Sequence, residues 1–128
     1  MQKNQNYYLG VKAIIKSKTG TVLLLKHAKG HWDFPGGRIQ ESEQPIEALL
    51  REVSEETGLT ALNINNIKSH SMVLTPVKIS SENATSGLIL WYHTCTLESD
   101  FPVVLSDEHT QYIWAPIDQV KALTNLDV

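Results

Sequence analysis

Apolar residues recur along the chain with the spacing of a helix in one segment. Between residues 45 and 57 they follow the pattern i, i+3, i+4, i+7, at Ile46, Leu49, Leu50 and Val53. This is the pattern of one buried helix face. Pro45 suits the first turn of a helix, and Gly58 can adopt the left-handed conformation that ends one. The pattern therefore predicts a helix over residues 45–57.

Shorter apolar runs between turn signals predict strands. They cover residues 9–16, 21–26, 62–80, 88–97 and 111–115. The first two flank the turn Lys18-Thr19-Gly20, which favours a hairpin. The continuous apolar run 22–25 indicates a strand that is covered on both faces. Pro76, inside the longest run, indicates an edge strand or a bend.

The remaining segments predict loops and a second helix. Loops are expected over residues 27–33, 80–87 and 100–107, and a helix opened by proline over 116–123. Strands interleaved with two helices indicate an α/β fold with a mixed sheet. The length fits one domain, which we expect to span residues 1–128.

Composition narrows the classes of partner. The net charge of −3 offers no basic patch for duplex nucleic acid, and it repels an anionic substrate unless a metal reverses the local sign. The polar N-terminus lacks the apolar core of a secretory signal, and no apolar run reaches the ~18 residues of a membrane span. We therefore expect a cytoplasmic protein with no membrane partner. Cys95 lies in an apolar run and is expected to be a buried hydrophobe.

Three acids share one stripe of the predicted helix. Glu52, Glu55 and Glu56 stand at i, i+3 and i+4, and no Lys or Arg follows any of them by four residues. Like charges at this spacing each cost roughly 0.2–0.5 kcal/mol. The stripe is either a solvated acidic face or a site for Mg²⁺ or Mn²⁺, which prefer carboxylate oxygens.

The region around these acids carries a known signature. Gly37, then Glu43 after five residues, then Arg-Glu-Val-Ser-Glu-Glu-Thr-Gly-Leu over residues 51–59 matches the box of the Nudix hydrolase superfamily. Through this box the chain resembles that superfamily. The resemblance implies the Nudix fold, a mixed sheet sandwiched between helices. It also implies metal-dependent hydrolysis of a nucleoside diphosphate linked to another group.

The resemblance assigns roles to residues of the box. It implies that Glu52, Glu55 and Glu56 hold Mg²⁺ or Mn²⁺, joined by the backbone carbonyl of Gly36. Glu52 or a nearby carboxylate such as Glu55 would activate the attacking water. Arg51, which can pair with Glu47 or Glu55 on a helix, would have an orienting role in catalysis.

Several residues outside the helix are further candidates. Glu43 is expected to support the site rather than to bind the metal. Many Nudix proteins carry another acid before the last strand, and Glu108 fits that location, although a solvated loop acid is equally consistent. Glu98, at the end of a strand, is a weaker candidate.

The contacts with substrate are less defined. Trp32 and Arg38 are candidates for substrate binding, while core packing is the alternative for Trp32. The aromatic residues on later strands are expected in the core, with one of them possible as a base-stacking residue: Trp91, Tyr92, Tyr112 and Trp114. The histidines lack zinc-ligand spacing and are interpreted as surface or satisfied core residues: His27, His31, His70, His93 and His109.

The substrate expected is a nucleoside triphosphate, including an oxidised or non-standard one. ADP-ribose or a sugar nucleotide is the alternative, since Pro76 lies near the position of a proline common in ADP-ribose hydrolases. Dinucleoside polyphosphates and RNA ends are less favoured, because those enzymes commonly have Lys where this chain has Gly36. A nucleotide sensor without catalysis and an interaction domain remain as other classes. A homodimer is possible.

Overall fold

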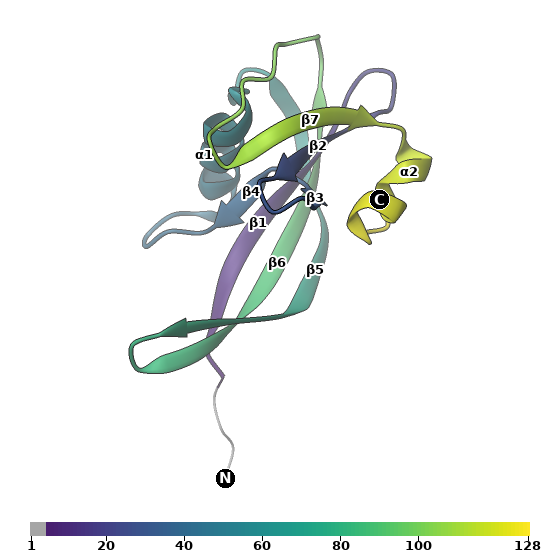
Figure 1. Cartoon of the computed structure of the whole chain (residues 1–128). Helices are drawn as coiled ribbons and strands as arrows, with labels where there is room; N and C mark the ends of the chain where they lie inside the picture. The colour runs from purple at the N-terminus through teal and green to yellow at the C-terminus, as the bar shows by residue number, and fades with distance from the viewer. Residues whose placement is uncertain (1–4) are drawn as a thin grey trace.

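The computed structural model describes residues 5–128 of the chain. It contains seven strands and two helices in the described part (Figure 1). In chain order they are β1 (Tyr7–Lys16), β2 (Val22–His27), β3 (Trp32–Asp33), β4 (Gly36–Arg38), α1 (Pro45–Thr57), β5 (Ile64–Ser81), β6 (Ala84–Leu97), β7 (His109–Ala115) and α2 (Ile117–Thr124). Both predicted helices are present, and α1 has the predicted bounds.

The strands form one mixed sheet. Its order is β3-β2-β1-β6-β5, with β4 paired to β1 and β7 paired to β2. β1 and β6 run parallel from Tyr7↔Gly87 to Lys16↔Thr96. All the other pairs in the described part are antiparallel. The mixed sheet that the sequence predicts is confirmed.

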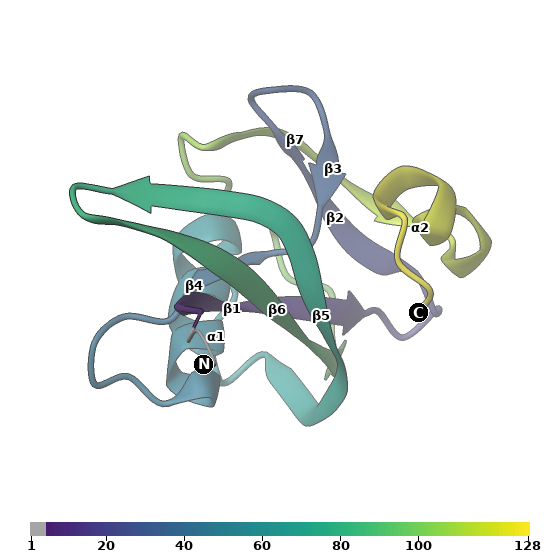
Figure 2. The same cartoon turned by 90° about the horizontal axis from the view of Figure 1, so that it is seen from below.

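Alternation along β1 divides the core between two helices. Val11, Ala13 and Ile15 belong to the apolar cluster that contains α1 residues, and Ile14 belongs to the cluster that contains Val120 of α2. Successive side chains of a strand point to opposite faces, so each face of β1 is covered by a different helix. Figure 2 shows α1 and α2 on opposite sides of the sheet. The predicted arrangement of a sheet between helices is confirmed.

Buried apolar side chains concentrate on the central strands. Residues 22–25 are fully buried, as the apolar run predicts, and Cys95 is buried as well. Each fully buried Leu, Ile or Val contributes about 1.5–3 kcal/mol relative to exposure. Strands β1 and β2, with the helix faces packed on them, therefore form the rigid core that positions the loops.

The predicted hairpin of β1 and β2 is only partly correct. A tight turn joins the two strands, but they pair at Lys16↔Val22 alone. Beyond that pair, β1 continues beside β6 and β4, while β2 continues beside β7. Apolar patterning identifies a strand but does not identify which strand lies next to it.

The predicted polar loop over residues 80–87 is wrong. β5 and β6 pair as far as Ser81↔Ala84, so a long two-stranded arm ends in a turn of two residues. Figure 1 shows this arm extending away from the rest of the sheet. Most residues near its tip are exposed on both faces, and an apolar alternation is therefore missing from the sequence. Pro76 lies in β5, at the edge of the sheet, as expected.

The predicted loop over residues 27–33 also contains structure. Trp32 and Asp33 form β3 beside β2, and residues 36–38 form β4 beside β1. Strands of two or three residues show no period that a sequence could reveal. β4 matters for the site, because it holds Gly36 and Gly37 between β1 and α1.

Across residues 5–128, no helix combines the length and the apolar character needed to cross a membrane.

Gly36 is expected to tolerate no side chain. A Cβ at this position would collide with the carbonyl oxygen of Val11 and lie 2.9 Å from the Cα of Lys12, both of which are backbone atoms of β1. We predict that Gly36→Ala lowers the free energy of unfolding by about 3 kcal/mol or more, as measured by denaturant titration.

The matched control is Gly30→Ala. Gly30 also has positive φ, +99°, but nothing lies within 4 Å of its added Cβ. Its cost should be only the conformational one, about 1–2 kcal/mol. Equal losses in the two variants would contradict the proposed collision at β4.

Candidate functional site: a carboxylate pocket between α1 and the loop before β7

Helix α1 presents its three acids to different environments. Glu56 is buried, with 4% of its surface exposed, whereas the side chains of Glu52 and Glu55 are 17% and 57% exposed. Ala48, Leu49 and Val53, on the adjoining face of the helix, are buried in the core. The packing of this apolar face sets the rotation of α1 and therefore the direction of the acids.

The guanidinium of Arg51 lies among several of these carboxylates. Its Nε donates to Glu43 at 2.6 Å and its Nη2 donates to the other oxygen of Glu43 at 3.0 Å. Its Nη1 donates to Glu52 at 2.9 Å and to Glu55 at 3.3 Å. The expected pair with Glu55 is present, but in the described part Arg51 forms no ion pair with Glu47. Arg51 also contacts Glu43 and Glu52, which are not related to it by the i,i+4 spacing of a helix.

Glu43 lies just before α1 and contacts both the loop and the helix. Its Oε1 also accepts a hydrogen bond from the backbone N–H of Gln40, at 2.9 Å. The bond to Arg51 holds the pKa of the Glu43 carboxyl below its usual range. Arg51 in turn donates from Nη2 to the carbonyl of Arg38. The loop between β4 and α1 is thereby tied to the helix.

Two glycines of β4 lie directly beside the acids. The N–H of Gly36 donates to Oε1 of Glu56 at 3.0 Å. The carboxylate of Glu52 covers Gly37 so closely that an added Cβ would lie 2.5 Å from its carbon and from Oε1. Both glycines thus allow β4 to lie close against α1 and β1.

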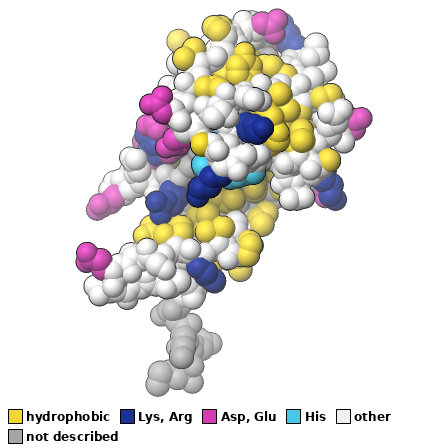
Figure 3. Space-filling model, in the orientation of Figure 1, with side chains coloured by type: hydrophobic (Ala, Val, Ile, Leu, Met, Phe, Trp, Pro, Cys, Tyr) yellow, Lys and Arg dark blue, Asp and Glu magenta, His cyan; other side chains and the backbone are white. Residues whose placement is uncertain are grey.

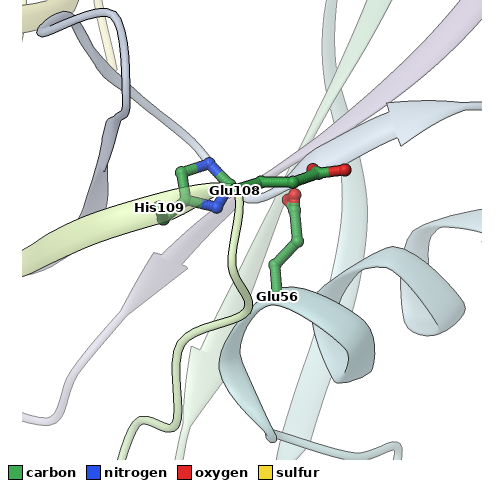
Figure 4. A group of neighbouring side chains, drawn as sticks. All are labelled: Glu56, Glu108 and His109. Carbon is green, nitrogen blue, oxygen red and sulfur yellow. The ribbon is translucent and has the colours of Figure 1, made fainter.

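A second segment brings two more potential metal ligands close to Glu56. Glu56, Glu108 and His109 each have one atom that could bind a metal, and these three atoms all lie within 4.8 Å of one another. Figure 4 shows the Glu56 side chain rising from α1 toward the segment that carries Glu108 and His109. The sequence left Glu108 open between a site residue and a solvated loop acid; in the structure it is exposed and lines the pocket beside Glu56. Glu98 is exposed and is absent from this group.

His109 was missed by reasoning from the sequence. Its ring belongs to a group of three, since it meets His27 edge-on at 6.0 Å, and His27 stacks on His31 at 4.8 Å. Burial and the neighbouring His27 lower the pKa of His109. The only signal available was its position directly after Glu108.

Lys12 was also missed. It extends from β1, and its Nζ lies 2.8 Å from Oδ2 of Asp33. Burial raises the pKa of Glu56, and the charge of Lys12 opposes that rise; burial lowers the pKa of His109, and the charge of Lys12 adds to that lowering. A single Lys in a strand pattern carries no sign of such a location.

The acids line an open pocket of about 800 Å³. Its walls come from β1, β4, the loop after β4, α1 and the loop before β7, and the residues are Tyr8, Gly36, Gly37, Arg38, Ile39, Gln40, Arg51, Glu52, Glu55, Glu56, Ser106, Asp107 and Glu108. Figure 3 shows acidic and basic side chains next to one another beside a hollow above the arm. A pocket with clustered carboxylates can hold a divalent cation and the anionic group that the cation attracts.

The two substrate-binding candidates lie in different places. Arg38 lines the pocket, and its guanidinium lies over the ring of Tyr8, 4.8 Å from the centroid. Trp32 does not line the pocket and packs against the apolar cluster on the α2 side. The strand aromatics Trp91, Tyr92 and Trp114 also pack against the core, but the prediction is wrong for Tyr112, which is exposed.

The fold and the pocket agree with the class that the signature indicates. The family model of the NUDIX domain matches residues 6–127, so the chain belongs to the Nudix family and is a Nudix hydrolase by descent. The recognition made from residues 37–59 is confirmed, and so is the Nudix fold.

Similar proteins carry names that differ in the substrate they mention. An 8-oxo-dGTP diphosphatase of Proteus vulgaris is 50% identical over 36 residues, which cover 28% of this chain and 32% of that protein. An asymmetrical bis(5'-nucleosyl)-tetraphosphatase of Rattus norvegicus is 28% identical over 115 residues, which cover 88% and 76%. The structure of the E. coli dihydroneopterin triphosphate pyrophosphohydrolase has a TM-score of 0.75 at 20% identity and covers 95% and 90%.

Glu56 generates a prediction about pH. Burial raises the pKa of its carboxyl from 4.5 to about 7. Between these values the folded protein holds a proton that the unfolded chain has released. Stability of the metal-free protein therefore rises as the pH falls from 7 toward 4.5, and the cost of the buried charge is fully present above pH 7.

We predict that Glu56→Gln stabilises the metal-free protein at pH 8 by up to a few kcal/mol, since one pKa unit corresponds to about 1.4 kcal/mol. The gain over the wild type should shrink at pH 5, as measured by denaturant unfolding in chelator. Glu55→Gln is the control, because its carboxylate is largely exposed. A gain that is the same at both pH values would show that Glu56 ionises normally.

Proposed function

We propose that this chain hydrolyses a phosphoanhydride bond of a nucleoside diphosphate derivative with the help of a divalent metal ion. The observation that carries the proposal is the meeting of α1 acids with Glu108 in one pocket. These acids come from segments about fifty residues apart. Membership of the Nudix family supports the same reaction class.

The donors fit Mg²⁺ or Mn²⁺. Both ions prefer oxygen ligands, and Glu56 is a buried carboxylate that burial keeps from ionising easily. In this proposal Glu52, Glu55, Glu56 and Glu108 hold the metal together with the carbonyl of Gly36. When bound, the metal polarises the phosphoryl oxygens and lowers the pKa of bound water.

The remaining steps fall to the side chains. Arg51 binds Oε1 of Glu52 and fixes the direction of this carboxylate. Glu52 then orients the attacking water and accepts its proton. Arg38, held over Tyr8 at the end of β4, contacts the anionic part of the substrate. Trp32 lies outside the pocket, so we assign it no contact with substrate.

A nucleoside triphosphate is the substrate that we favour. The name of the Proteus relative, an 8-oxo-dGTP diphosphatase, supports this class. The name of the rat relative favours a dinucleoside polyphosphate, which the sequence ranked lower because of Gly36. ADP-ribose and sugar nucleotides are the other alternative. A sensor without catalysis fits less well, because every acid of the box is retained.

We predict that a screen of these four substrate classes finds hydrolysis only with added divalent metal. Activity should stop when EDTA is added and return when Mg²⁺ exceeds the chelator, because the pocket carboxylates are the metal ligands. Released pyrophosphate or phosphate is the measurement. Full activity in chelator would overturn the metal-dependent mechanism, and binding without any release would favour the sensor.

Glu52→Gln tests the centre of the proposed site. The change keeps the shape and removes one charge, so turnover should fall by roughly 10²–10⁴, the usual effect of losing a general base. Glu47→Gln is the matched control, since it makes the same change in the first turn of α1, outside the pocket.

The bond from Arg51 to Glu52 alters what to expect for stability. Repulsion among the acids is already compensated by the guanidinium, so Glu52→Gln should change the melting temperature little. It should reduce the thermal protection that Mg²⁺ gives. A variant that melts early but turns over at the wild-type rate would assign Glu52 a structural role instead.

A further inference from the structure

The imidazole of His109 has no role in the mechanism proposed above, although it lies next to two carboxylates of the site. One of its nitrogens is within 4.8 Å of an oxygen from Glu56 and from Glu108. These two acids come from α1 and from the loop before β7, and Figure 4 shows the ring beside them. Within residues 5–128, no ion pair joins His109 to either acid.

The polar atoms of this segment are also unsatisfied. Nδ1 of His109 is buried and has no hydrogen-bond partner among residues 5–128, and the same holds for Oγ of Ser106. A buried polar atom without a partner has lost its hydration without gaining a bond, which destabilises the folded state. Such atoms call for an explanation in a native structure, and a bound ion is one of the recognised explanations.

Packing alone does not account for the ring. His109 meets His27 edge-on, and an apolar ring would make that contact without leaving a nitrogen unpaired. His27 differs in this respect, because its Nδ1 accepts a hydrogen bond from the N–H of Lys29. The unpaired nitrogen is therefore a property of His109 and not of the whole group of histidines.

We propose that His109 is a further ligand of the metal ion that Glu56 and Glu108 hold, and that it makes this site favour a transition-metal ion over Mg²⁺. The inference rests on the function proposed above. Imidazole is a good ligand for first-row transition metals, and the affinity of mixed nitrogen and oxygen sites rises from Mn²⁺ to Co²⁺ and beyond. Mg²⁺ prefers oxygen donors and keeps several of its waters, so it gains little from the ring.

The probe is Co²⁺ alone, added to the metal-free protein at one slightly alkaline pH. Its visible absorption and the shifted NMR signals of coordinated imidazole report the ligands directly, without any substrate. Competition with Mg²⁺ gives the relative affinity. We expect the wild type to show a coordinated imidazole signal and to release Co²⁺ only at a large excess of Mg²⁺.

The variants separate a ligand from a packing element. His109→Gln should weaken Co²⁺ binding by about tenfold or more, while Mg²⁺ binding changes less than about twofold. His109→Phe keeps an aromatic ring against His27 and should lose Co²⁺ affinity to the same extent. His31→Gln is the matched control, because it alters the same group of histidines at an exposed position. It should leave the Co²⁺ signals unchanged.

The possible results distinguish this inference from the proposed function. Mg²⁺-dependent hydrolysis with no change in metal preference in either His109 variant would overturn the inference alone. An imidazole signal that survives His109→Phe would also overturn it. Absence of both hydrolysis and Co²⁺ binding in the wild type would overturn the two proposals together. If one of the two His109 variants does not unfold cooperatively, the other is used in its place. The two differ in chemistry, because one introduces an amide and the other a phenyl ring.

Discussion

The site depends on one guanidinium that lies among like charges. Arg51 donates to Glu43, Glu52 and Glu55, and without it these carboxylates would repel one another on and beside a short helix. The side chain is 22% exposed, so water screens these contacts only partly. The carboxylates raise the pKa of Arg51, which therefore remains a cation at every accessible pH. The positions of two proposed metal ligands are thus fixed by the protein itself.

This compensation is uneven across the pocket. The acids held by Arg51 have a cation of their own, whereas within residues 5–128 Glu56 receives only the N–H of Gly36 and the more distant charge of Lys12. Lys12 is engaged with Asp33, and Glu108 adds further negative charge beside Glu56. Among residues 5–128, the carboxylates around Arg51 are therefore bonded to a cation, while Glu56 is not. In the proposed mechanism, a divalent ion supplies a positive charge beside Glu56.

The local features of the site were predictable from the sequence, but its assembly was not. The period of the apolar residues determines helix α1 and its acidic stripe, and both follow from contacts within a few residues. Glu43 and Arg51 are eight positions apart, so no helical rule connects them, and the partner of Arg51 was predicted only in part. β3 and β4 are too short to show a period. His109 joins Glu56 through the pairing of β7 with β2, which depends on the whole sheet.

The long arm has a consequence for how the protein behaves among its own copies. β5 is an edge strand of 18 residues with exposed apolar side chains, including Met72 and Leu74. An edge of that kind is a template on which strands of other chains can add. Here the register shifts three times, after Asn65, Ser69 and Leu74, and regular pairing runs for four residues at most, as in Ser71–Leu74. Bulges and Pro76 twist the edge and interrupt its row of donors, so that a foreign strand finds only short matching stretches. Such interruptions are among the features by which edge strands resist intermolecular sheet growth.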